Sequence, residues 1–581
     1  MKTTTKFGLK LFAILICFSL KPDIAITQDI SEQAKQLNER LNKDPFKIGG
    51  GIQLGAAGVL SNLDVARAIP FSARGHASLN LDFLGVKAPF SLTYSTGGKA
   101  FNYSLPSYAF AGISPSYKWV KLHLGDRSMG LGRYVYSGQS FRGAGIELSP
   151  NNWKVASFYG RIRRTTAQNI NSFQRIDPLY KRMGYGLAAG FDNKVDKLMV
   201  SVLHGKDDLN SLPFVDSTLL FNPASNTVWS VQGNKKLTDK LSVGLEWAKS
   251  AFTENSKDAL ARSASFYESM GGLEKINQST RWGTAFNAFV KLNIAKTNLE
   301  VNYEKVSPGF KTMGALYFRN DYENINAGLK FPALNKKLLT NLKIGIERNN
   351  LKNTNANEYS RFVFNLNTQY RLNPKTDFGL NASTFNNTIV QSTPLSISNP
   401  LEVNQLLSTN ANYGAYANYQ IQQNEQYVSV VSVQLGRSSG YTVINDEIQN
   451  DKVSSNSIFV NYNKQNIKNN AQQGLQISYI QNGMMQSTFN TVSLAANLTR
   501  PFLNKKSTFN ITLGGGLNMQ KENGLLKNVP YTQSSVGFNY QIDQKTELSF
   551  NNMLYKNFGD KAIPMGDLTE LRSFLSFNFR I

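Results

Sequence analysis

Alternation of apolar and polar residues recurs along most of the chain and constrains its fold more than any other feature. In TNLEVNY, residues 297–303, Leu299, Val301 and Tyr303 alternate with polar residues. The same pattern occurs in LSVGLEW (241–247), RFVFNLNTQYR (361–371), LQISY (475–479) and the final LRSFLSFNFRI (571–581). A period of two predicts β-strands with one apolar and one polar face. After residue 27 we find no run of 18 consecutive apolar residues, the length that a membrane-spanning helix needs.

The number and spacing of these segments favour one large sheet. We count roughly 24–26 strands of about 9–11 residues, the length that crosses a bilayer when a strand is tilted. Short turns such as Asn504-Lys505-Lys506 alternate with longer connections. The longer connections fall at 206–224, 251–280, 388–408 and 438–454. Short turns on one side and long loops on the other are typical of outer-membrane barrels.

The position of the aromatic residues and the need to pair every strand edge predict closure of the sheet. The 25 Tyr and 36 Phe crowd strand ends, where interfacial girdles would lie. Strands in lipid must pair along both edges, and only a closed ring achieves this. We therefore expect an all-β protein in which residues 47–581 form a large closed antiparallel transmembrane β-barrel. A secreted soluble β-rich adhesin, with its strands in sandwiches or a solenoid, remains the alternative.

The first 27 residues predict a secretory signal peptide. Lys2, Lys6 and Lys10 precede an apolar stretch of roughly ten residues, and small residues follow it before Gln28. The only cysteine, Cys17, lies in this apolar stretch, so the mature chain is expected to be exported without disulfides. Residues 28–46 then carry an apolar stripe at helical spacing and predict a short amphipathic helix, either in the barrel mouth or beneath the wall.

The charge of the chain bears on its partners. Removal of residues 1–27 takes away four lysines and one aspartate and lowers the formal net charge from +24 to +21. Because an exported chain seldom meets nucleic acid, we expect no nucleic-acid partner. Anionic lipid and lipopolysaccharide phosphates, or a lumen that prefers anions, suit this charge better. A generally basic, solvated surface is the simpler interpretation.

Residues 113–164 contain the most distinctive stretch, LGDRSM…GQSFRGAGIEL. Gly125 and Asp126, followed by Ser140 to Gly143, resemble the strand-turn-strand that opens ushers for pilus assembly and segments of other large secretion barrels. The resemblance covers under a tenth of the chain and implies protein translocation. The periplasmic domains and the inserted plug of ushers have no counterpart in this sequence. A tight β-hairpin with close-packed glycines and a lumenal Asp–Arg pair is the alternative.

Charged residues around this stretch are candidates for lumenal groups, because rings of cationic side chains select anions in pores. The alternative for those at strand ends is contact with lipid phosphates. The candidates are Asp126, Arg127, Arg133, Arg142, Arg161 and Arg163.

Catalysis and metal binding find little support. The chain has three histidines, His76, His123 and His204, of which His123 could neighbour Asp126. A histidine satisfied within a strand is the simpler interpretation, so we expect no enzymatic activity, no cofactor and no metal site.

The sequence therefore predicts passage across the outer membrane, by a channel or by the barrel component of a transport or secretion complex. The alternative is a structural or interaction barrel that displays long surface loops and has a blocked lumen. Expected partners are outer-membrane lipid and lipopolysaccharide, the barrel-assembly machinery, and a plug or secretion protein. A plug that precedes the barrel in the same chain is disfavoured, because about twenty residues separate Gln28 from the first strand.

Overall fold

The computed structural model describes residues 46–581 except for a set of connecting segments. These segments are residues 63–69, 84, 97, 101–102, 106–107, 168–177, 213–220, 260–263, 316–317, 350, 352–359, 392–403, 445–446, 449–452, 485–486, 505, 523–524 and 560–566. The expected signal peptide and N-terminal helix lie outside the described residues, apart from Phe46, with which the first strand begins.

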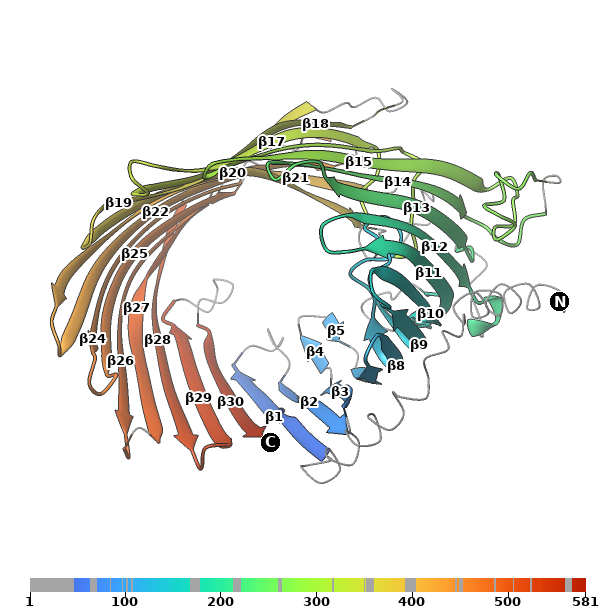
Figure 1. Ribbon diagram of the computed structural model, residues 1–581. Helices are drawn as coiled ribbons and strands as arrows, with labels where there is room; N and C mark the ends of the chain where they lie inside the picture. Colours follow the sequence, from blue (N-terminus) through green and yellow to red (C-terminus); the bar gives the residue numbers. More distant parts are fainter. Residues whose placement is uncertain are drawn as a thin grey trace, which may run out of the picture.

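The described residues form a closed antiparallel barrel of 26 strands (Figure 1). Each strand pairs with the strands before and after it in the chain, so the ring is an up-and-down barrel without crossover connections. The prediction of an all-β, closed barrel with 24–26 strands is confirmed. Within the described residues no helix is long and apolar enough to cross a membrane.

The strands of the first half of the ring are β1 (Phe46–Ser61), β2 (Phe71–Phe83), β3 (Val86–Ser95), β6 (Tyr108–Ile113), β8 (Val120–Ser128), β9 (Ser140–Leu148), β10 (Trp153–Arg163), β11 (Arg182–Asp192), β12 (Lys197–Asp207), β13 (Ser225–Lys236), β14 (Leu241–Thr253), β15 (Thr280–Ile294) and β16 (Thr297–Val306). Those of the second half are β17 (Tyr322–Ala333), β18 (Leu338–Asn349), β19 (Ser360–Asn373), β20 (Thr376–Gln391), β21 (Asn404–Gln423), β22 (Tyr427–Ile444), β24 (Val453–Asn466), β25 (Gln472–Met484), β26 (Ser487–Phe502), β27 (Ser507–Glu522), β28 (Leu525–Gln541), β29 (Thr546–Asn557) and β30 (Thr569–Arg580). Short additional elements are β4 (Gly98–Ala100), β5 (Tyr103–Leu105), β7 (Ser116–Tyr117), β23 (Glu447–Ile448) and the 3-10 turn η1 (Leu209–Ser211).

The ring closes where the last strand pairs with the first. β30 runs antiparallel to β1 from Gly51 opposite Arg580 to Ser61 opposite Glu570. The alternating end of the sequence is therefore a wall strand with a neighbour on each side. Closure leaves no strand edge at this junction to attract another chain.

The two faces of the wall differ in chemistry. In β10, Tyr159 is 62% exposed on the outside, whereas its neighbour Phe158 is 2% exposed and faces inward. Outward residues of other strands repeat this, as with Leu54, Leu245 and Leu575, which are each about half exposed. An apolar outer face of this kind is stable in lipid and not in water.

The rims of the ring also differ. Strands at one rim are joined by connections of two to six residues, such as 149–152, 193–196 and 237–240. The long connections lie at the other rim, which we call the long-loop rim. Because the number of strands is even, β1 begins and β30 ends at the short-turn rim. The wall is uneven in height, since β21 has 20 residues whereas β8 and β9 have 9 each.

Candidate functional site in the barrel lumen

One long connection folds into the barrel. Residues 129–139, between β8 and β9, form what we call the inner loop, and Tyr134, Val135 and Tyr136 in it are at most 1% exposed. The inner loop contributes to an apolar cluster on the inner wall of β10 to β16. Its buried members are Met129, Leu131, Tyr134, Val135, Tyr136, Phe141, Phe158, Ala188, Leu203, Val228, Ala248, Ala285, Val306 and Phe310.

Small residues on the inner wall make room for this loop. A side chain at Gly186 would collide with Leu131, and one at Gly145 would contact the Sδ atom of Met129 at 2.7 Å. The described residues of the connection 307–321 also pack against the loop, and Gly314 lies so close to Val135 that a Cβ atom would strike its carbonyl oxygen. The inner wall is therefore shaped to hold the inner loop.

An acidic residue of the wall holds the inner loop by hydrogen bonds. The Tyr134 hydroxyl donates to Glu304 Oε1 at 2.8 Å, and Arg133 Nη2 donates to Glu304 Oε2 at 2.9 Å. The Glu246 carboxylate lies beside Gly132 of the same loop. Burial, followed by the neighbouring Glu304 carboxylate, raises the pKa of Tyr134, so its phenol stays a neutral donor.

Further ion pairs line the lumen beyond the inner loop. Asp207, which is 3% exposed, accepts from Arg163 at 3.0 Å and from Arg182 at 2.8 and 3.1 Å. On the inner face of β8 and β9, His123 Nε2 lies 2.7 Å from Glu147 Oε1, while His123 Nδ1 lies 3.1 Å from the Ser114 hydroxyl. These parts of the inner wall are thus polar and charged, as a hydrated lumen requires.

The Asp126–Arg142 pair lies on the other face of the wall. Arg142 Nε donates to Asp126 Oδ1 at 2.8 Å and Arg142 Nη2 donates to Asp126 Oδ2 at 2.6 Å, a bidentate geometry. Arg142 follows the lumen-facing Phe141 in β9, so strand alternation turns it outward. Arg161 lies directly opposite Arg142 in the neighbouring strand and shares this face.

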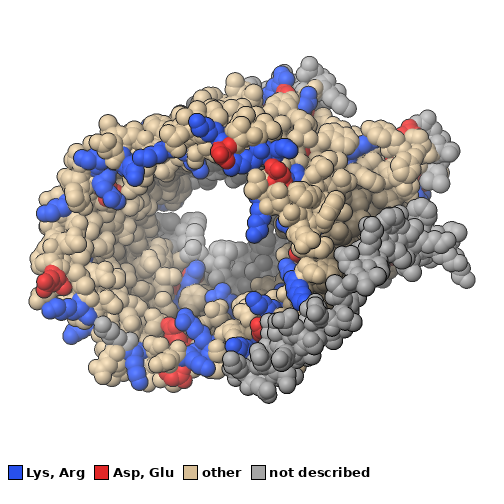
Figure 2. Space-filling view, viewed as in Figure 1, with Lys and Arg blue, Asp and Glu red and all other residues tan. Residues whose placement is uncertain are grey.

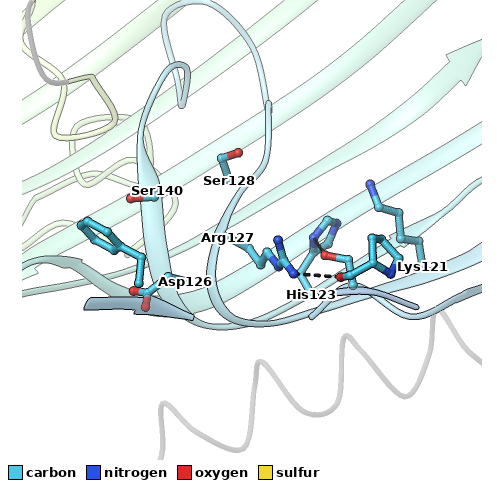
Figure 3. A pocket seen from close by; sticks show the side chains of 9 residues that line it. Lys121, His123, Asp126, Arg127, Ser128 and Ser140 are labelled. Carbon is cyan, nitrogen blue, oxygen red and sulfur yellow. Dashed lines mark hydrogen bonds between the residues drawn. The ribbon is translucent and has the colours of Figure 1, made fainter. Parts of the chain in front are cut away.

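A cavity of about 410 Å³ lies beside this pair (Figure 3). Arg127 reaches toward His123 and Lys121, whereas Asp126 lies at the other end of the cavity (Figure 3). Arg127 donates to Ser91 Oγ at 3.0 Å and to the carbonyl oxygens of Pro89 and Gly112. Its Nε atom is buried and has no acceptor among the described residues.

The structure divides the candidate residues into groups. Arg127, Arg133 and Arg163 face the lumen, and each is engaged by different partners. Asp126, Arg142 and Arg161 lie on the outward face near the long-loop rim. The alternation of β8, β9 and β10 separates the two groups, because consecutive strand residues point to opposite faces.

Sequence reasoning missed Tyr134, Glu304, Arg182 and Asp207. A signal was present in the small residues Gly143, Gly145, Gly184, Gly186 and Ala188, which recur on one strand face. Such a face leaves space for another segment to pack against it. The identity of that segment depends on contacts between residues 170 positions apart, as with Tyr134 and Glu304.

Another long connection covers part of the outer wall. The described residues 254–259 and 264–279, which we call the outer flap, lie over β13 to β15. The indole nitrogens of Trp229 and Trp282 donate to the carbonyl oxygens of Met270 and Glu268 at 3.2 and 3.1 Å. Glu274 is 3% exposed and accepts from Ser225, Thr227 and Thr253.

An open passage runs through the centre of the ring (Figure 2). Lys and Arg outnumber Asp and Glu around its margin in this view. A closed antiparallel ring with an apolar outside and a hollow inside defines the class of the protein: it has the architecture of a transmembrane β-barrel.

Comparison with known proteins finds similarity at the level of structure. No protein-family model and no curated protein sequence matches the chain. Among solved structures, the P pilus usher (PapC) translocation pore is 10% identical, with 92% of this chain and 100% of that chain covered and a TM-score of 0.38. The FrpB iron transporter from Neisseria meningitidis is also 10% identical, with 94% and 83% covered and a TM-score of 0.39. For the copper transporter OprC the identity is 9%, the coverage 92% and 80%, and the TM-score 0.37.

Proposed function

We propose that this chain mediates passage across the outer membrane, as a channel or as the barrel component of a transport or secretion complex. The observation that carries the proposal is the open passage inside a closed ring whose outer face is apolar (Figure 2). A structure of this kind separates a hydrated path from lipid. The chain reaches the membrane after removal of residues 1–27, and the barrel-assembly machinery inserts it.

The charge around the passage favours anionic solutes or polymers. The formal net charge of the whole chain is +24, and cationic groups dominate the visible margin of the passage (Figure 2). Cationic groups at a pore raise the local concentration of anions. The outward Arg142 and Arg161 instead suit lipopolysaccharide phosphates at the long-loop rim.

The width of the ring supports a role in a larger complex. Barrels of about 16–18 strands leave an aqueous channel, and those of about 22 strands have a plugged lumen. A ring of 26 strands is wider still, and the inner loop of 11 residues covers part of the inner wall. A separate plug or secretion protein would complete the closure.

Conductance in planar bilayers tests this proposal. We expect stable openings, with a reversal potential displaced toward the chloride equilibrium potential in a KCl gradient. Deletion of inner-loop residues 130–138 should raise the single-channel conductance. Deletion of outer-flap residues 264–273 is the matched control, since it removes a segment of the same rim from the outside of the wall.

The inner loop also favours a second candidate function, a structural or interaction barrel with a blocked lumen. Its apolar packing and its hydrogen bonds to Glu304 hold it as part of the core rather than as a movable gate. Bilayers that stay silent with both the full-length barrel and the inner-loop deletion would support this candidate and contradict the passage proposal.

A further inference from the structure

The backbone ladder of the ring is interrupted between β6 and β8. Pairing of these strands stops at Gly112 opposite Gly125, after two residue pairs. On their other sides β6 keeps six pairs with β3, and β8 keeps nine pairs with β9. Within the described residues, Tyr108–Ala111 and Asp126–Ser128 therefore have a strand neighbour on one side only. The interruption opens toward the long-loop rim.

A glycine in β8 produces this interruption. Gly125 has a φ of 86°, in the left-handed region that side chains disfavour. A Cβ atom at Gly125 would strike the carbonyl oxygen of Ala111 across the junction. The strands are thus in tight contact at Gly125, and their backbone ladder ends at this residue.

Side chains take over the hydrogen bonds that the ladder no longer makes. The Ala111 amide donates to Asp126 Oδ2 at 3.0 Å, and Arg142 Nη2 donates to the Ala109 carbonyl at 2.8 Å. Since Asp126 and Arg142 also bind one another, this pair forms a clasp across the interruption. The side chains of the clasp thus bind backbone amide and carbonyl groups of the β6 edge, and they can release these groups to another strand.

The cavity of about 410 Å³ lies at the interruption, and its lining mixes polar and apolar groups, as a peptide requires. Its lining includes Asp126, Ser128 and Ser140, together with Arg127, whose buried Nε atom has no acceptor among the described residues. A peptide backbone would pair with the strand edge, whereas a lipid acyl chain would leave that edge unpaired at a cost. Phe110 offers a surface for an alternating side chain.

We propose that the interruption between β6 and β8 is a docking edge for an extended polypeptide segment. The segment adds as a strand to Tyr108–Ala111 or Asp126–Ser128 when the Asp126–Arg142 clasp releases them. This inference depends on the proposed passage function in one respect: it names polypeptide as a class of substrate that the barrel would carry. The docking edge itself follows from the ladder, the clasp and the cavity.

Site-specific photocrosslinking tests this proposal. A benzophenone amino acid replaces Phe110, or Phe289 as the matched control, which lies on the inner face of β15 where both neighbouring ladders are continuous. The probe is a biotinylated, uncharged peptide of eight residues that alternates valine and threonine. We expect labelling at position 110 and none at 289, and an increase of about tenfold with Asp126→Asn or Arg142→Gln, since charge-assisted hydrogen bonds are lost. The exchanged double variant D126R/R142D should return labelling to the original level.

Equal labelling at positions 110 and 289, or none at 110, would overturn the proposal. Gel mobility before and after boiling shows whether the single clasp variants fold. If they do not, labelling at position 110 against position 289 in the protein with Asp126 and Arg142 intact still tests the proposal. A parallel arm uses unlabelled peptide and vesicles with a biotinylated phospholipid, and labelling by lipid instead of peptide also overturns the proposal. Conductance of the same preparations separates the two proposals. If the barrel gives no current but position 110 is still labelled by the peptide, the channel proposal fails and the docking edge stands.

Discussion

Among single residues, Glu304 binds the inner loop with both of its carboxylate oxygens. Its two oxygens accept from Tyr134 and Arg133, and it is 7% exposed on the inner face of β16. Hydrogen bonds to a charged group contribute about 1.5–3 kcal/mol each, so their weakening should shift the loop population by roughly tenfold or more. We therefore predict that Glu304→Gln increases the frequency of current fluctuations in single-channel recordings.

A matched control for this variant lies on the same strand and the same face. Glu300 pairs with Lys291 at 3.4 Å and lies four residues before Glu304 in β16, further from the inner loop. Glu300→Gln should leave the fluctuations unchanged. If both variants behave alike, the effect comes from lumenal charge in general and not from the inner loop.

Glu274 gives the outer flap a dependence on pH. Burial raises the pKa of its carboxyl group, and His204 and Lys206 of the neighbouring strand are the titratable groups beside it. A carboxyl group with a raised pKa binds its proton more tightly when the flap is docked, so docking weakens as pH rises through that pKa. We predict that the flap is cleaved faster by protease as pH rises, relative to Glu274→Gln at each pH.

The ratio of the two cleavage rates is the quantity to measure, because it cancels the pH dependence of the protease itself. At low pH the protonated carboxyl resembles the glutamine amide, and the ratio should approach one. A ratio that stays constant from low to neutral pH would show that the carboxyl does not control docking.

At the scale of single elements, β30 shows how alternation places adjacent residues in different solvents. Leu575 is 47% exposed on the outer face, and Ser576 is the next residue, on the inner face. Arginine on the lipid face of a barrel costs about 2–4 kcal/mol near the bilayer midplane. We predict that Leu575→Arg lowers the free energy of unfolding in lipid vesicles by this amount, whereas Ser576→Arg changes it little. Equal losses from both variants would contradict the assignment of faces.

The strands could be predicted from the sequence where neighbouring residues alone determine the strand pattern. Alternation identified strands such as 297–303 and 475–479, and the short turns indicated where one strand of a hairpin ends and the next begins. These features depend on neighbouring residues, because an outer-membrane strand alternates wherever it crosses lipid. The number of strands followed from their length and spacing.

The candidate site was less accessible, because it depends on register and on distant contacts. Asp126 and Arg142 were singled out together, and they do bind one another. A shift of one residue in the strand register decides which face each side chain occupies. The position of the neighbouring β6 edge cannot be predicted from the sequence of the hairpin alone. The inner loop depends on Glu304, which lies far along the chain.

At the scale of the whole molecule, closure between β1 and β30 governs stability. Residues 571–581 contain most of the last strand, which pairs with β1 on one side and β29 on the other. We predict that deletion of 571–581 abolishes the shift in gel mobility that folded barrels show between unboiled and boiled samples in SDS. Deletion of outer-flap residues 264–273 should preserve that shift. A truncated chain that retains it would close its ring by another pairing.

The uneven wall has a consequence for the surrounding lipid. At about 3.3 Å per residue and a tilt of about 45°, strands of nine residues such as β8 and β9 rise about 21 Å, less than the apolar band of about 25 Å typical of such barrels. Mismatch of this kind is relieved by local thinning of the bilayer. The membrane should therefore be thinnest beside the stretch of wall where the backbone ladder is broken, and a polar segment would meet its smallest hydrocarbon barrier there.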